Sequence, residues 1–214
     1  MAVRLARQLG LRLEWQILDA RRTVGPSVRQ IDPVHSAMGE FEAEHLRSLN
    51  YSVGIDEPYQ HFQFAGRADF VAWDMASRAL LHIENRTRFP DLQEVAGSFN
   101  AKRAYLAAAL GERLGIRAWA SQTHVMAGLW SAEVLHSVRM RPATFRALRP
   151  DTQDAFMAWW SGDAPKTGIR TLFVALDPLA SSRQRPFVGL DEALVRARPR
   201  HRGYADAALR LYAA

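Results

Sequence analysis

Two acidic residues within residues 66–88 have the types and spacing of a metal-dependent hydrolytic site. Asp69 interrupts an otherwise apolar run, and Glu84 stands near the end of a second apolar run. A carboxylate inside a buried strand is costly unless it is paired or bound to a metal. If the two runs form neighbouring strands of a hairpin, the carboxylates converge within the reach of one ion. Oxygen ligands of this kind suit Mg²⁺ or Mn²⁺.

Arg86 adds a cation to this pair of acids. It follows Glu84 by two residues and therefore projects from the same face of the strand. Phosphodiester hydrolysis needs a metal that polarises the phosphate and activates water, and a cation that balances charge in the transition state. The alternative interpretation is a structural ion-pair network that joins Asp69 and Glu84 to Arg67, Arg86 or Arg88.

The elements expected around these residues follow from periodicity and capping signals. Asp32-Pro33 predicts a helix that reaches about Leu49, and Pro90-Asp91 predicts a helix that reaches about Gly111. Strands are expected at 51–55, 60–73 with a bend at Gly66, 79–86 and 116–125. The order is helix, strand, strand, strand, helix, strand. Later elements are expected as helices at 132–138, 152–160 and 204–211 and a strand at 171–176.

The sequence divides into two regions that differ in the secondary structure they predict. Residues 1–30 predict a short helix at 3–9, a strand at 11–18 and a linker. Residues 31–214 predict one α/β domain with a mixed central sheet flanked by helices, its core at about 33–126 and a C-terminal α/β extension at 127–214. The segment ARQLGLRLEW resembles the tail that follows helix-turn-helix domains in some bacterial regulators. No helix-turn-helix precedes this segment in the sequence. The chain could therefore be a natural variant of such a regulator or a shortened form of one, and both explanations stay open.

The segments GRADFV, residues 66–71, and IENRTR, residues 83–88, together resemble the motifs of the PD-(D/E)XK nuclease superfamily. The resemblance covers about residues 33–126 and implies a restriction-endonuclease-like αβββαβ core. It also implies Mg²⁺ or Mn²⁺ bound by Asp69, Glu84 and the carbonyl of Asn85. Arg86 stands where the superfamily has lysine, and arginine cannot act as a base. Lys102, in the following helix, is the expected substitute.

Further residues take roles from the same resemblance. Glu40, within GEFEAEHLRSLNY at 39–51, is the best match to the superfamily's helix glutamate, although Glu42 and Glu44 are equally plausible surface acids. Lys102 can alternatively lie at the edge of an apolar stripe with its amine in solvent. His82 is interpreted as a packed or hydrogen-bonded histidine rather than a ligand, and His61 and His124 are isolated.

The charge of the chain favours a polyanionic partner. The formal net charge is +6 and the pI about 10.3, and almost all the excess is arginine, because Lys102 and Lys166 are the only lysines. Arginine suits phosphate contacts, although a GC-rich genome gives the same bias. The residues expected to contact DNA are Arg67, Arg88, Gln93, Arg183 and Arg185.

Other function classes lack support. Cysteine is absent, which excludes disulfides and cysteine-based metal sites and favours a reducing compartment. The N-terminus lacks the features of a signal peptide, and no apolar stretch is long enough to span a membrane. There is no P-loop, dinucleotide fingerprint or nucleophile elbow. We therefore expect a cytoplasmic protein with DNA as partner, no membrane partner, and a homodimer as one possible assembly.

Two functions remain open at this point. The first is a metal-dependent nuclease-like protein that hydrolyses or binds DNA phosphodiesters through Asp69 and Glu84. The second is a non-catalytic DNA-binding regulator or an antitoxin-like module on the same fold.

Overall fold

The computed structural model describes residues 32–61 and 64–213. The chain consists of two compact units, Met1–Asp32 and Pro33–Ala214. The fold described below is that of the second unit. The helix expected at 3–9 and the strand expected at 11–18 lie outside the described residues.

The first elements follow the expected order of one helix, three strands, one helix and one strand. They are α2 (Pro33–Ser48), β1 (Ser52–His61), β2 (Phe64–Asp74), β3 (Ala79–Arg86), α3 (Leu92–Leu114) and β4 (Ser121–Leu129). The remaining elements are α4 (Ala132–Met140), α5 (Pro142–Leu148), α6 (Asp154–Trp160), β5 (Gly168–Leu176), β6 (Phe187–Gly189), α7 (Leu190–Val195) and α8 (Tyr204–Ala213).

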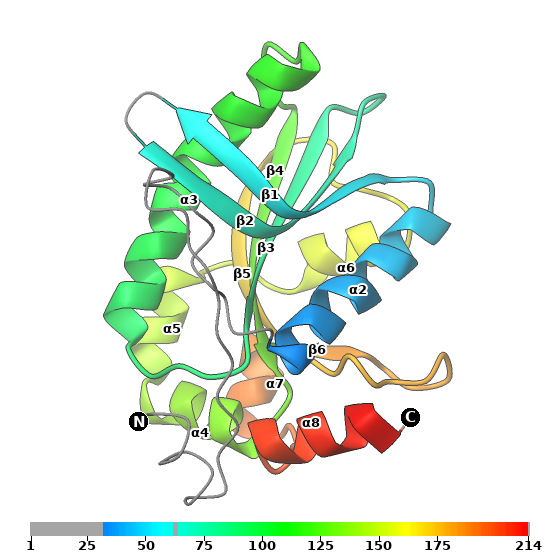
Figure 1. Cartoon of the computed structure of the whole chain (residues 1–214). Helices are drawn as coiled ribbons and strands as arrows, with labels where there is room; N and C mark the ends of the chain where they lie inside the picture. Colours follow the sequence, from blue (N-terminus) through cyan, green and yellow to red (C-terminus); the bar gives the residue numbers. More distant parts are fainter. Residues whose placement is uncertain (1–31, 62–63, 214) are drawn as a thin grey trace, which may run out of the picture. The chain divides into compact units, whose positions relative to one another are not determined.

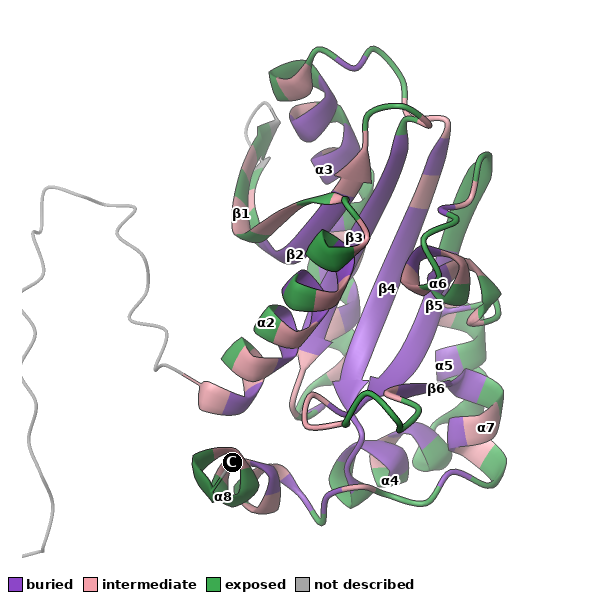
Figure 2. Cartoon of the chain, turned by 90° about the vertical axis from the view of Figure 1, so that its right-hand side faces the viewer, coloured by how far each residue is buried: buried purple, intermediate pink, exposed green. Residues whose placement is uncertain are grey.

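In the described part of the chain, six strands form one mixed sheet in the order β1-β2-β3-β4-β5-β6. The pairs β1–β2, β2–β3 and β5–β6 are antiparallel, whereas β3–β4 and β4–β5 are parallel. Figure 2 shows that the central strands are largely buried and that β1 at the edge is more exposed. The expected α/β class, with a mixed sheet flanked by helices, is confirmed.

The helices cover both faces of this sheet (Figure 1). On one face, Phe99 of α3 stacks on His82 of β3, and Phe145 of α5 packs edge-on against Phe173 of β5. On the other face lie α2 and α6, and Trp159 of α6 donates a hydrogen bond to the Thr123 hydroxyl of β4. Because side chains alternate along a strand, β3 presents its even-numbered residues to α3 and its odd-numbered residues to α2.

The long helix α3 has well-defined ends. The Asp91 side chain accepts hydrogen bonds from the backbone N–H groups of Gln93 and Glu94, which satisfies two of the unpaired donors of the first turn. Gly115 ends the helix with φ 70°, a left-handed conformation that suits glycine. These caps fix the length of α3 and therefore the place of Lys102 along the sheet.

Several expected boundaries were wrong. The apolar run after Gly115 is not yet strand, because β4 begins only at Ser121. Residues 60 and 61 belong to β1 rather than β2, since β1 and β2 form a hairpin that joins His61 to Phe64. Gly66, where a bend was expected, lies within the continuous strand β2, and a Cβ there would lie 2.8 Å from the Tyr59 hydroxyl. The short elements α5, β6 and α7 were not predicted.

Candidate metal centre

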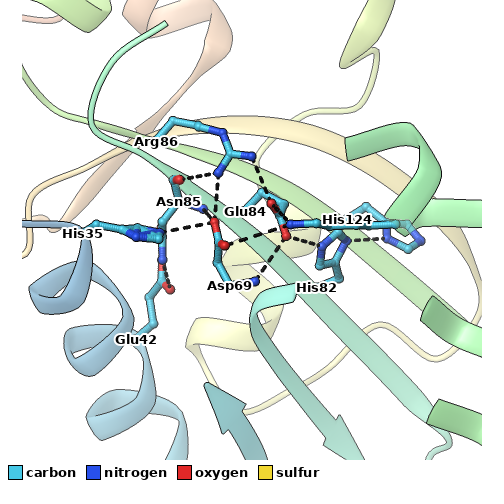
Figure 3. Close-up of polar contacts among 9 residues, drawn as sticks. His35, Glu42, Asp69, His82, Glu84, Asn85, Arg86 and His124 are labelled. Atoms are coloured by element: carbon cyan, nitrogen blue, oxygen red, sulfur yellow. Dashed lines mark hydrogen bonds and ion pairs between the residues drawn. The ribbon is translucent and has the colours of Figure 1, made fainter. Parts of the chain in front are cut away.

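The acids Asp69 and Glu84 lie side by side where β2 and β3 stop pairing. The ladder runs from Asp74↔Ala79 to Phe70↔Ile83 and ends there. Beyond it, the Asp69 N–H donates to Glu84 Oε1 at 3.2 Å, and the Asn85 N–H donates to Asp69 Oδ2 at 3.0 Å. These two hydrogen bonds thus continue the connection of β2 to β3 beyond the last backbone pair. Figure 3 shows the two carboxylates next to each other, and Lys102 of α3 contacts that of Glu84. The expected adjacency of these strands and acids is confirmed.

Arg86, the last residue of β3, contacts both carboxylates. Its guanidinium donates to Asp69 Oδ2 at 2.9 Å, to the Asn85 carbonyl oxygen at 2.7 Å and to Glu84 Oε2 at 3.1 Å. These are the three groups that the sequence assigned to a metal. The Nη1 atom contacts the oxygens of Asp69 and Asn85, and Nη2 contacts the oxygen of Glu84, so one guanidinium joins all three groups.

Lys102 reaches the same acids from α3. Its ammonium lies 2.5 Å from Glu84 Oε2 and 4.0 Å from Asp69 Oδ1, and the side chain is only 9% exposed. The alternative of a solvent-directed lysine at a stripe edge does not hold, because the amine points inward. Lys102 therefore belongs to the cluster, as the resemblance implied.

The helix acid of the cluster is Glu42, and the choice of Glu40 was wrong in position. Glu40 is exposed, whereas Glu42 is fully buried and accepts a hydrogen bond of 3.0 Å from the Asn85 side-chain amide. Val34, Met38 and Leu46, also buried, lie at four-residue spacing from Glu42 on one face of α2. That spacing was the signal in the sequence that could have separated Glu42 from Glu40.

Burial dominates the chemistry of Glu42. Removal from water raises its pKa to about 8, partly opposed by the Asn85 hydrogen bond and helped by the negative charge of Asp69. Glu42 is thus largely protonated at neutral pH. Its Oε1 and the Asn85 Oδ1 are buried without a hydrogen-bond partner among the described residues. Buried oxygens in this condition favour an additional cation or donor at the site.

His35 of α2 also joins the cluster and was not predicted. Its Nε2 lies 3.2 Å from Asp69 Oδ2, and its side chain is 28% exposed. A histidine in the first turn of a helix carries no spacing signal toward a strand acid, so the sequence offered no means of finding it.

Glu84 is ionised in this setting. Burial raises its pKa, but the hydrogen bond and charge of His82, then the charges of Lys102 and Arg86, outweigh burial and hold the pKa well below its usual range. Two carboxylates, Asp69 and Glu84, thus face two permanent or readily charged cations, Arg86 and Lys102. The cluster is close to electrically balanced without a metal.

The residues expected to contact DNA do not gather at this cluster. Arg67 pairs with Asp56 at 2.7 Å, and Arg88 lies over the Tyr204 ring, 5.1 Å from its centroid. Arg185 pairs with Glu192 at 2.7 Å. Gln93 and Arg183 are exposed, in the first turn of α3 and in the segment between β5 and β6 respectively.

The donor chemistry of the cluster fits a divalent cation of the magnesium type. Mg²⁺ is commonly held by one or two carboxylates, with water and substrate oxygens completing the shell. Asp69, Glu84 and the Asn85 carbonyl supply hard oxygens of this kind. Among residues 32–61 and 64–213, no three His, Asp or Glu side chains gather in a metal-binding arrangement, so a metal held here would also need the backbone carbonyl of Asn85 as a ligand.

Comparison of the chain with protein-family models and with curated proteins finds no match. Within the described residues, no helix has the length and apolar character needed to cross a membrane.

Proposed function

We propose that this chain is a Mg²⁺- or Mn²⁺-dependent nuclease-like protein that hydrolyses DNA phosphodiesters. The observation that carries the proposal is the convergence of Asp69 Oδ2, Glu84 Oε2 and the Asn85 carbonyl on one cationic group. Three hard oxygens around one cationic group could supply the protein part of a Mg²⁺ shell, which water and substrate oxygens would complete. The order of α2, β1, β2, β3, α3 and β4 supports the same proposal, since it agrees with the core implied by the motif resemblance.

Asp69, Glu84 and the Asn85 carbonyl would hold the metal. A divalent ion bound there would polarise a phosphate oxygen and lower the pKa of an attacking water. Arg86 must leave these oxygens to make room, and its guanidinium then suits a nonbridging phosphate oxygen, for which it offers paired donors. Its side chain is 21% exposed, so it already borders solvent.

Lys102 supplies the amine that the motif lacks at residue 86. Its ammonium lies beside Glu84 Oε2, next to the groups that would hold the metal. In that place it can orient a water molecule or stabilise charge on the phosphate as the bond to the leaving oxygen breaks. A lysine can also give up its proton and then act as a base, which an arginine cannot do in proteins.

A non-catalytic DNA-binding module is the second candidate, and one observation favours it. The guanidinium of Arg86 already satisfies the three oxygens that a metal would need, and with Lys102 it balances both acids. A fold that had lost catalysis would retain an internal ion-pair cluster of this kind.

A cleavage assay separates the two candidates. Purified full-length chain is incubated with plasmid and linear DNA in Mg²⁺ or Mn²⁺, with chelator as control. The nuclease proposal expects cleavage that stops with chelator and is lost in Asp69→Asn. If no metal supports cleavage while the parent still binds DNA, the non-catalytic function is the correct one.

A further inference from the structure

A buried row of polar side chains extends from Glu84 along the α3 face of β3 and β4. His82 Nε2 lies 3.1 Å from Glu84 Oε1, and His82 Nδ1 lies 3.2 Å from His124 Nδ1. His124 Nε2 in turn lies 3.3 Å from Gln122 Oε1. His82 and His124 lie side by side on one face of the sheet, because they occupy paired positions on the parallel strands β3 and β4 (Figure 3). None of the roles described above uses this row.

The His82 ring is held on several sides. Both histidines are fully buried. Phe99 stacks on the His82 ring at 5.5 Å between centroids, and the His124 ring meets it edge-on at 76°. A ring confined in this way cannot turn away from Glu84 without disturbing the core.

The residues at the two ends of the row, Glu84 and Gln122, limit where the ring hydrogens of His82 and His124 can lie. His82 Nε2 lies at hydrogen-bond distance from a carboxylate oxygen, which accepts, so in this contact His82 Nε2 carries the hydrogen. Burial, then the charges of His82, Arg103 and Arg149, hold the pKa of His124 well below its usual value, so His124 is neutral and one of its nitrogens is bare. The two Nδ1 atoms share one hydrogen, and the Gln122 amide can present either oxygen or NH₂ to His124 Nε2. In either arrangement His82 keeps its Nε2–H on Glu84.

The contact with His82 fixes the orientation of the Glu84 carboxylate. Its Oε1 accepts from both the Asp69 N–H and His82 Nε2, so that oxygen is occupied by two fixed donors. Its Oε2 is the oxygen that faces Arg86 and Lys102. The row therefore determines which oxygen of Glu84 is turned toward the cation position.

We propose that His82 is a positioning residue that holds Glu84 with Oε2 directed at the metal, and that His124 holds His82 in the required tautomer. This inference rests on the proposed function, since it assigns the residues that orient a ligand of that site. Partners behind the ligands fix their orientation, and their loss typically weakens metal binding by about 10- to 100-fold.

The test measures Mg²⁺ affinity by calorimetry on the full chain and its variants. His82→Leu removes the donor and should weaken binding by about tenfold or more. His82→Gln retains an amide donor and should recover most of that loss. Thr123→Val is the matched control, because it removes a buried hydrogen bond on the opposite face of the neighbouring strand, and it should leave affinity unchanged. Unchanged affinity in His82→Leu, or no recovery in His82→Gln, would overturn the proposal.

A metal-free readout keeps the inference distinct from the proposed function. Nitrogen-15 NMR of the histidine rings should show His82 protonated at Nε2 in the parent, and His124→Leu should shift the His82 Nδ1 signal. This measurement also decides the matter if His82→Leu does not fold. If the parent binds no Mg²⁺, the proposed function fails and the NMR spectrum judges the inference alone. A bare Nε2 on His82 would then contradict it.

Discussion

Arg86 is the residue on which the chemistry depends, because it contacts every oxygen that a metal would use. A guanidinium and a divalent ion cannot hold the same oxygens together. On the proposed function, the internal cation would compete with the metal, and the affinity for metal would be reduced by the free energy needed to displace the guanidinium.

Arg86→Gln should consequently bind Mg²⁺ more tightly than the parent, while its metal-free form should be less stable by up to about 3 kcal/mol, since Glu84 and Asp69 lose a partner. Calorimetric titration and urea unfolding with chelator measure the two effects. Arg88→Gln is the control, because Arg88 is exposed two residues further along the chain. Weaker metal binding in Arg86→Gln would show that the guanidinium helps to hold the metal rather than competing with it.

Glu42 gives the cluster a defined pH dependence. Its pKa rises from an ordinary value of 4.5 to about 8 on folding, so between these values the folded state keeps a proton that the unfolded chain has lost. Glu42 therefore costs no stability below about 4.5, the cost grows as pH rises to about 8, and it is constant above.

Glu42→Gln removes this dependence. The variant should match the parent in acid and exceed it by an amount on the order of a few kcal/mol at alkaline pH. Urea unfolding across the pH range, in chelator, provides the measurement. A constant difference between the two proteins from acid to alkaline pH would mean that Glu42 titrates normally.

The sequence identified Asp69, Glu84 and the neighbouring Arg86 and Lys102, but it missed Glu42 and His35. Asp69 and Glu84 could be predicted because charged residues in apolar runs are rare and because a hairpin brings the two runs together. Three glutamates follow one another at two-residue spacing, and only the four-residue spacing of Glu42 with the apolar residues Val34, Met38 and Leu46 distinguishes it from the other two. His35 comes from the first turn of α2, and nothing in the local sequence relates it to Asp69.

At the scale of elements, α3 places its one lysine against the end of the sheet. The Asp91 cap sets the start of the helix, and Phe99, packed on His82, aligns the turn that carries Lys102. The start of α3 and the packing of Phe99 thus set the position of Lys102 along β3, and this position brings its amine to Glu84.

Lys102→Met should lower DNA cleavage by about a hundredfold or more while leaving Mg²⁺ binding intact or stronger, because a cation is removed from beside the metal ligands. Lys166→Met is a matched control, since Lys166 is the only other lysine and is exposed. Cleavage rates and calorimetry are compared for the two variants. Equal rates in Lys102→Met and the parent would remove Lys102 from the mechanism.

Long elements were predictable and short ones were not. The helices α2 and α3 carry capping residues and several turns of apolar spacing, so their existence and approximate bounds could be predicted. The helices α5 and α7 and the strand β6 have at most seven residues each, too few to establish a period. They form because β5 offers them a surface to pack on, and the sequence of a short segment does not contain that information.

The whole molecule is basic, with a formal net charge of +6. Several arginines expected to contact DNA are engaged with acids in the structure, as Arg67 is with Asp56 and Arg185 with Glu192. Surface pairs of this kind are weak, so phosphates can compete for these arginines.

We therefore expect DNA binding whose affinity falls steeply between about 50 and 200 mM salt, because each phosphate contact releases a counterion. Fluorescence anisotropy with a labelled duplex, in chelator, measures the slope. Arg183→Gln combined with Arg185→Gln should reduce the slope if the segment between β5 and β6 touches the backbone. Binding that is absent at low salt, or insensitive to salt, would exclude DNA as the partner.

Mn²⁺ binding tests most directly the proposal that Asp69, Glu84 and the Asn85 carbonyl hold a divalent metal. Calorimetric titration of the parent with Mn²⁺ should show stoichiometric binding that Mg²⁺ competes for. Asp69→Asn should lose it, and Asp163→Asn, at an exposed acid after α6, should retain it. A parent that binds no Mn²⁺, or an Asp69→Asn variant that binds it as the parent does, would contradict the account.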